Sequence, residues 1–191
     1  MKLWHILFDT LKKLWYNDSH IEKEELMNLY SALDVARYVV NYANDNDMIV
    51  SNLKLQKILY FVQLQFLINN AKRPCFDDDI EAWAFGPVVP EVYREFKRYG
   101  SLSIPPVTEY YDLSNGYWNL EKKTYKTKIA EPDQRVINSV VNICNNHSAS
   151  DLVSITHRQS PWMDAYGKKN PIISKESMID FIDKHIKDEN R

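Results

Sequence analysis

The most apolar stretch of the chain, residues 58–68, limits what it can fold into more than any other feature. Gln63 and Gln65 interrupt this stretch, and it falls short of the roughly 18 residues that a membrane-spanning helix needs. The apolar spacing instead predicts a long helix that begins after a capping Ser51 and pairs with the preceding helix. We therefore expect a soluble, cytoplasmic protein that has no membrane partner.

Length and cysteine content both indicate a hydrophobic core that is stable without disulfides or a structural metal. A chain of 191 residues, 45% apolar and 26% charged, has the composition of one ordinary globular domain or two very small ones. At this length folding buries roughly 70% of the surface, so neither disulfides nor a structural metal is required. The two cysteines, Cys75 and Cys144, form no C-x-x-C pair, which favours a reducing compartment.

Charge and motif spacing disfavour several classes of function. Lys and Arg total 24 and Asp and Glu total 26, which gives a net charge of −2 and disfavours nucleic acid as a partner. The nearest approach to a basic face is Lys122, Lys123, Lys126 and Lys128. The glycines fit no phosphate-binding loop and the histidines fit no metal-binding spacing, so we expect no cofactor and no metal.

The start of the chain is predicted to be an amphipathic helix. At 100° per residue, its large apolar side chains fall within an arc of about 140°. They are Leu3, Trp4, Leu7, Phe8, Leu11, Leu14 and Trp15. Asp9, Lys12 and Lys13 interrupt the apolar run, so we predict no signal peptide, and packing on protein is favoured over a membrane surface. We place a boundary near residue 30, between an N-terminal helix and linker, 1–30, and a domain, 31–191.

The middle of the chain predicts short elements. Ser31 caps a helix that runs to Asn41 or beyond. The alternating segment 80–85 predicts one short strand that Gly86-Pro87 ends, with Gly86 permitting a tight turn. A short amphipathic helix is then expected from Pro90 to Tyr99, followed by Gly100 at its left-handed C-terminal position.

The second half of the chain predicts a hairpin and further helices. Asn115-Gly116 predicts a type I′ turn between strands at 110–114 and 117–120. Three helices follow: from near Pro132 to Asn145, from Ser150 to before Pro161, and after a capping Ser174. The predicted fold class is therefore α+β and predominantly helical, a compact helical domain with a short strand and a β-hairpin, plus the amphipathic N-terminal helix.

A cluster of carboxylates offers the one pattern with catalytic potential. Asp77, Asp78, Asp79 and Glu81 could hold a divalent cation or act as paired acid and base, as in a hydrolase or nuclease. Carboxylates between a proline and a strand more often form a solvated turn, and we favour that interpretation. The hydrolase is kept as an alternative.

Three segments carry more specific patterns. Residues 53–63 read LKLQKILYFVQ, residues 80–93 read IEAWAFGPVVPEVY, and residues 156–162 read THRQSPW. In these motifs, and in the spacing between the first two, the chain resembles the SocA-like antitoxin family, also called the Panacea domain. The resemblance covers roughly residues 31–185.

The resemblance implies a function without catalysis by the chain itself. Members of the family are antitoxins that neutralise a cognate protein toxin by direct binding, and some of these toxins are small alarmone-synthetase-like enzymes. At least one member instead acts as an adaptor that delivers its toxin to the protease ClpXP. Occlusion is our principal hypothesis and the adaptor is the alternative, while the oligomeric state is left open.

Candidate contacts with the toxin come from aromatic and apolar side chains, because such residues anchor protein interfaces. From the N-terminal helix we select Trp4, Phe8, Leu11 and Trp15. From the motifs we select Trp83, Phe85, Pro87, Val88, Tyr93, His157 and Trp162. Aromatic residues beside a rigid turn are more often packed in the core, so the competing interpretation of the motif residues is structural.

Overall fold

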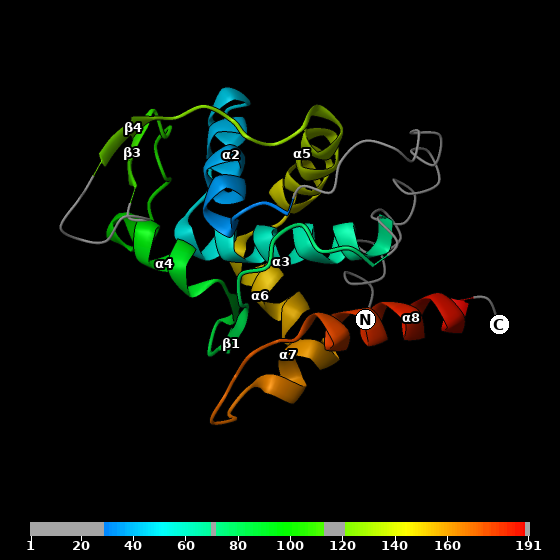
Figure 1. Ribbon diagram of the computed structural model, residues 1–191. Helices are drawn as coiled ribbons and strands as arrows, with labels where there is room; N and C mark the ends of the chain where they lie inside the picture. The colour runs from blue at the N-terminus through cyan, green and yellow to red at the C-terminus, as the bar shows by residue number, and fades with distance from the viewer. Residues whose placement is uncertain (1–28, 70–71, 113–120, 190–191) are drawn as a thin grey trace.

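The computed structural model describes residues 29–69, 72–112 and 121–189, and the predicted N-terminal helix lies outside these ranges. Seven α-helices and two separate two-stranded antiparallel sheets occupy the described residues. The predicted fold class, α+β and predominantly helical, is confirmed. Figure 1 shows one helix, α3 (Asn52–Asn69), running through the middle of the molecule with the other elements around it.

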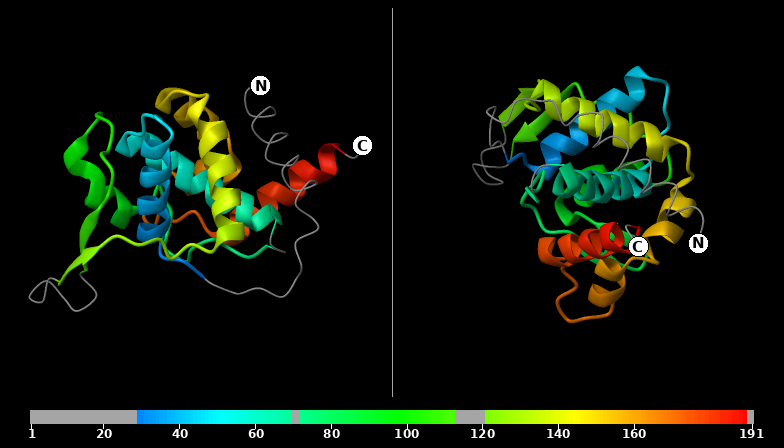
Figure 2. Two further views of the ribbon diagram at one scale, coloured as in Figure 1. Left: turned by 90° about the horizontal axis from the view of Figure 1, so that it is seen from above. Right: turned by 90° about the vertical axis from the view of Figure 1, so that its right-hand side faces the viewer.

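Helix α3 is buried on all sides, as its apolar sequence requires. It contacts α2 (Ala32–Asp45), α4 (Pro90–Phe96), α5 (Glu131–Asn145), α6 (Ala149–Thr156) and α8 (Lys175–Glu189). The two views in Figure 2 show α3 enclosed in this way from above and from the side. None of the helices in the described residues is long and apolar enough to cross a membrane.

Local rules place several helix ends as predicted. Ser31 caps α2 by accepting from the Asp34 amide, and α2 packs on α3. Pro90 begins α4, a 3₁₀ turn (Lys97–Tyr99) continues it, and Gly100 follows with φ of +56°. Ser174 accepts from the Ser177 amide at the start of α8.

The predicted short strand is confirmed at Glu81–Trp83, but the predicted end of the sheet at Gly86-Pro87 is wrong, because the chain folds back at once into a small hairpin. Strand β1 (Glu81–Trp83) pairs with β2 (Gly86–Val88), and Trp83 lies opposite Gly86. Gly86 does not end the sheet but begins its second strand, with φ of +89°. This conformation fits a short hairpin loop closed by a glycine and explains why the chain can reverse after only two residues.

The other edge of β1 is also occupied. The Ala82 amide donates to the Pro171 carbonyl at 2.8 Å, and the Ile173 amide donates to the Ile80 carbonyl at 2.7 Å. The segment before α8 therefore fixes the hairpin from the side opposite β2. This long-range pairing joins the middle of the sequence to its C-terminal part.

Two corrections concern the chain before and after α6. Its N-cap is Ser148, not Ser150, and Ser148 and Asp151 form a reciprocal capping box. After α6 ends, as expected before Pro161, a short helix that we did not predict, α7 (Ser160–Ala165), begins. Proline fits its first turn because the missing amide hydrogen would have no partner there.

The second hairpin consists of β3 (Glu109–Asp112) and β4 (Glu121–Thr124). Its predicted turn, Asn115-Gly116, and the predicted strand 117–120 lie outside the described residues. The described register pairs Asp112 with Glu121. The predicted two-residue turn at 115–116, continued without a bulge, would instead pair Asp112 with residue 119. The register of the described strands therefore differs by two residues from this prediction.

The packed structure includes Tyr30. This residue is buried, its amide donates to the Cys75 carbonyl at 3.0 Å, and its hydroxyl donates to Asp133 at 2.6 Å. The predicted boundary near residue 30 therefore falls beside a residue that already belongs to the core. Cys75 and Cys144 are both buried and free.

Candidate protein-binding site

The three sequence motifs come together around the first hairpin. The first motif supplies Lys57 from α3, the second supplies the turn between β1 and β2, and the third supplies Thr156 and His157 at the end of α6. We call residues 84–87 the Phe85 tip. Segments about 100 residues apart in sequence thus support one turn.

Gly86 makes the closest of these contacts. A Cβ atom at this position would lie 2.7 Å from the Thr156 hydroxyl oxygen and 2.8 Å from Cε of Lys57. No side chain fits in that space without moving its neighbours. Gly86 therefore serves both the positive φ of the turn and the close approach of α3 and α6.

Lys57 lies directly under the tip. It is 0% exposed, and its Nζ donates to the Pro87 carbonyl at 2.9 Å. Burial lowers the pKa of this amine to about 7. Burial also lowers the pKa of His157, as does the nearby charge of Lys57, while a hydrogen bond to the Ala84 carbonyl opposes this shift.

Two buried amides hold the chain that leaves the tip. Gln56 accepts from the Val89 amide at 3.0 Å and donates to Asn52 at 2.9 Å. Asn52 in turn donates to the Tyr93 carbonyl at 3.2 Å. The exit of β2 and the first turn of α4 are therefore fixed to α3 by a chain of hydrogen bonds.

Trp83 is half-buried and held on three sides. Its indole N–H donates to Glu81 at 2.7 Å, and its carbonyl accepts from the indole of Trp162 at 3.0 Å. Its ring meets Tyr93 edge to face, with 5.0 Å between the ring centroids. Trp162 is itself stacked between His157 and Tyr166. These aromatic contacts join the tip to α4 and α7.

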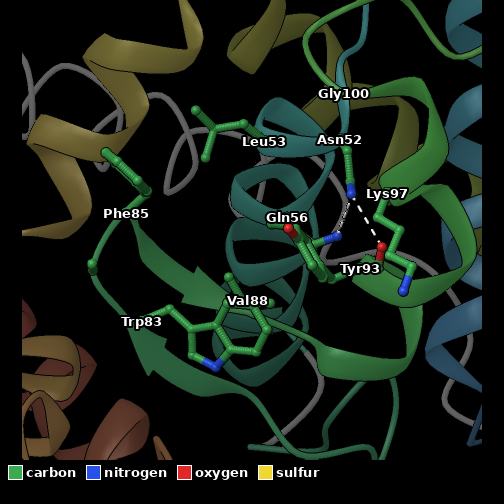
Figure 3. A pocket seen from close by; sticks show the side chains of 10 residues that line it. Asn52, Leu53, Gln56, Trp83, Phe85, Val88, Tyr93, Lys97 and Gly100 are labelled. Carbon is green, nitrogen blue, oxygen red and sulfur yellow. Dashed lines mark hydrogen bonds between the residues drawn. The ribbon is translucent and has the colours of Figure 1, made fainter.

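The supported turn presents an exposed aromatic surface. Phe85 is 68% exposed and Tyr93 is 37% exposed. Between them lies a groove of about 330 Å³ whose lining includes Leu53, Val88 and Trp83. We call it the aromatic groove, and Figure 3 shows Phe85 at one end of it and Lys97 near the other. Lys97 is the one charged residue of the lining.

The structure divides the predicted contact residues into two groups. Phe85, Tyr93 and the half-buried Trp83 reach the surface, and Val88 lines the groove although it is only 4% exposed. Pro87 and Trp162 are buried and His157 is half-buried, so these three lie beneath the surface that the others form. The other predicted contacts, Trp4, Phe8, Leu11 and Trp15, lie outside the described residues.

Residue-by-residue analysis of the sequence missed the buried polar support. Tyr60 is fully buried and donates to Gln159 at 2.6 Å, in addition to the roles of Gln56 and Lys57. One signal was available for Lys57. Its neighbours four residues away on the helix are Leu53 and Phe61, so no carboxylate could pair with it along α3.

Three of the four clustered carboxylates, Asp77, Asp78 and Glu81, bind structural partners. Asp78 accepts from the Ala32 amide at 2.9 Å, Asp77 pairs with Lys175 at 2.6 Å, and Glu81 binds the Trp83 indole. Each of these three carboxylates thus has its own structural partner. Within the described residues, no group of three or more His, Cys, Asp or Glu side chains is placed to hold a metal ion.

Comparison with known proteins agrees with the motifs. The family described as "Antitoxin SocA-like, Panacea domain" matches residues 55–163. A protein named Antitoxin SocA, from Caulobacter vibrioides (strain NA1000 / CB15N), is 35% identical over 129 residues, which are 67% of this chain and 66% of that protein. The chain thus matches just under two thirds of this relative's length. No solved structure matches it.

Proposed function

The chain belongs to the family of SocA-like antitoxins with a Panacea domain, and from this premise we propose that it neutralises a protein toxin by binding it at the Phe85 tip. The observation that carries the proposal is the exposure of Phe85, 68%, on a turn that buried side chains hold from below. Exposure of a large apolar side chain to water is unfavourable, and a partner that covers Phe85 would remove this cost.

The tip has the properties of an interface anchor. Aromatic residues on rigid supports lose little conformational freedom on binding and dominate the energetics of many interfaces. The aromatic groove beside Phe85 offers an apolar recess for a side chain of the partner, and Lys97 at its end favours a neighbouring carboxylate. We propose that this apolar and acidic combination is what the toxin presents.

A stable interface buries about 1,600 Å² in total, which is more than one groove supplies. We propose that the predicted apolar stripe of residues 1–30 adds a second contact, through Trp4, Phe8, Leu11 and Trp15. In this proposal the toxin is occluded and the chain itself performs no chemistry. Delivery to ClpXP is the alternative outcome, because an adaptor also needs to bind the toxin.

Substitution of Phe85 tests the site. In a bacterial host we would co-express the chain with the toxin encoded beside its gene, and measure growth rescue and the Kd of the purified pair. Phe85→Ala should raise Kd by about 30-fold, the effect of losing a 2 kcal/mol anchor. Tyr111→Ala is the matched control, because Tyr111 is also an exposed aromatic, 58%, but lies on the other hairpin.

The outcomes separate the hypotheses. Unchanged affinity of Phe85→Ala removes the tip from the interface, and a wild-type chain that binds no toxin refutes the proposed function. Rescue that disappears in cells without ClpX, while binding persists, favours the adaptor. Deletion of residues 1–18 tests the second contact in the same assay. If this contact exists, the shortened chain should fold but bind the toxin more weakly.

A further inference from the structure

The amine of Lys57 lies in a setting that is unusual for a lysine. The residue is 0% exposed, and the Pro87 carbonyl is the acceptor of its hydrogen bond. None of the ion pairs among the described residues includes Lys57. A buried ammonium without a carboxylate is costly, so this site favours the neutral amine.

The elements packed around Lys57 bring no negative charge to it. On α3 itself, Lys54 points to the Asn145 carbonyl, and Tyr60 is fully buried with a raised pKa, so that it stays neutral. From α6, Thr156 is uncharged and donates to the Val153 carbonyl, and His157 is another base. From the hairpin, the Pro87 carbonyl accepts from the amine and Gly86 lies against it, and neither residue carries a charge.

We infer that Lys57 is a positioning residue for the Phe85 tip, and that its protonation loosens the turn and weakens binding of the partner. The inference rests on the proposed function, because it assigns the control of that same site. It follows from two contacts. The amine holds the Pro87 carbonyl, and Cε of Lys57 lies where a Cβ of Gly86 would be.

The direction of the effect follows from the packing. Protonation strengthens the donor to the Pro87 carbonyl, but this one neutral acceptor replaces only part of the hydration that an ammonium loses on burial. The rest of the helix that carries Lys57 is enclosed by other helices of the core. Only the Phe85 tip separates Lys57 from solvent on this side. It consists of a two-residue loop, Ala84 and Phe85, followed by Gly86, which has no side chain to obstruct movement, and Pro87. Movement of the tip toward solvent would hydrate the charge and displace Phe85, which is adjacent to Gly86.

The test measures Kd of the full chain for the toxin encoded beside its gene at pH 8, 7 and 6. With a midpoint near 7, the neutral fraction of Lys57 falls about tenfold between pH 8 and pH 6. Kd of the wild type should therefore rise by up to about tenfold over this range. Lys57→Met should reduce the change to less than twofold.

Two variants serve as controls. Lys54→Met makes the same substitution on the same helix but at an amine that faces α5, and it should keep the wild-type profile. His157→Gln removes the other base near the tip. The inference is overturned if His157→Gln abolishes the change of Kd with pH while Lys57→Met keeps it. It is also overturned if Kd changes with pH to the same extent in all variants.

A second measurement does not depend on the toxin. In the uncomplexed full chain, the Lys57 side chain and the amides of Gly86 and Val88 should titrate together in NMR spectra, with a midpoint near 7. A Lys57 midpoint near 10.5, or tip amides that do not respond, overturns the inference even if Lys57→Met fails to fold. A wild-type chain that shows this titration but binds no toxin refutes the proposed function alone.

Discussion

The two hairpins of the described residues have similarly short strands, three residues each in β1 and β2 and four each in β3 and β4, but they are held in different ways. Buried side chains of α3, α6 and α7 contact the first hairpin through its backbone. The second hairpin is largely exposed on both faces and carries ion pairs between its own strands.

Tyr110 joins the second hairpin to helix α2. Tyr110 lies under the guanidinium of Arg37, whose carbon is 3.8 Å from the ring centroid. Its cross-strand pairs, Lys122 with Glu109 and Lys123 with Asp112, are exposed to solvent and therefore weak.

The difference between the two hairpins shows which of them can hold an aromatic side chain rigidly for binding to a partner. Phe85 and Tyr111 are both exposed, but only Phe85 lies on a backbone that buried donors hold in place. A rigid anchor loses less entropy on binding than a mobile one. We therefore expect substitutions under the first hairpin to be costly and substitutions on the second to be tolerated.

The largest effect is expected at Gly86. Gly86→Ala places a Cβ 2.7 Å from the Thr156 hydroxyl oxygen and 2.8 Å from Cε of Lys57, in a residue with φ of +89°. Backbone strain and displacement of buried neighbours together should lower the free energy of unfolding by about 3 kcal/mol. Urea denaturation followed by circular dichroism measures it.

Gly100→Ala separates the two causes of that loss. Gly100 also has a positive φ, +56°, but a Cβ there meets no atom within 4 Å. Its substitution should cost only the backbone strain, about 1 kcal/mol. Equal losses at the two glycines would contradict the close packing that we describe at the tip.

A smaller effect is expected at Trp162. Trp162→Phe keeps an aromatic ring between His157 and Tyr166 but removes the N–H that donates to the Trp83 carbonyl. Loss of this hydrogen bond should lower the free energy of unfolding by about 1.5 kcal/mol. Tyr166→Phe is the control, since it keeps the stack, and it should cost less than about 0.5 kcal/mol. A Trp162→Phe variant as stable as this control would show that the hairpin does not need the bond.

Much of the helical framework could be predicted because its signals are local. Ser31 and Ser174 act within one turn of the helices they cap, and Gly100 takes the positive φ that ends its helix. The apolar run of α3 requires burial wherever it lies in the fold. These features depend on neighbours in sequence, which the sequence displays directly.

The error at the first hairpin arose because distant segments decide its structure. The second strand of the first hairpin consists of Gly86, Pro87 and Val88, two of which are poor strand formers, and its place depends on Lys57 and Thr156. The same reason applies to the site. Exposed aromatics could be selected from the motif, but the buried polar residues that hold them meet only in the folded chain.

The smallest effect is expected on the second hairpin. Lys123→Ala removes an ion pair with Asp112 at 2.6 Å, and the hydrogen bond to that carboxylate raises the pKa of Lys123. A lysine whose pKa is raised on folding stabilises the folded state fully at every pH below its ordinary pKa of 10.5. The ion pair is therefore fully charged at pH 7. Solvent nevertheless screens it, because the Lys123 side chain is 39% exposed. We expect Tm to change by less than about 2 °C and toxin affinity by less than about twofold. Thermal unfolding at low and high salt measures the change in Tm, and the binding assay measures the change in affinity. A loss of affinity near that of Phe85→Ala would place the second hairpin in the interface and contradict the expectation that only the first hairpin binds the toxin.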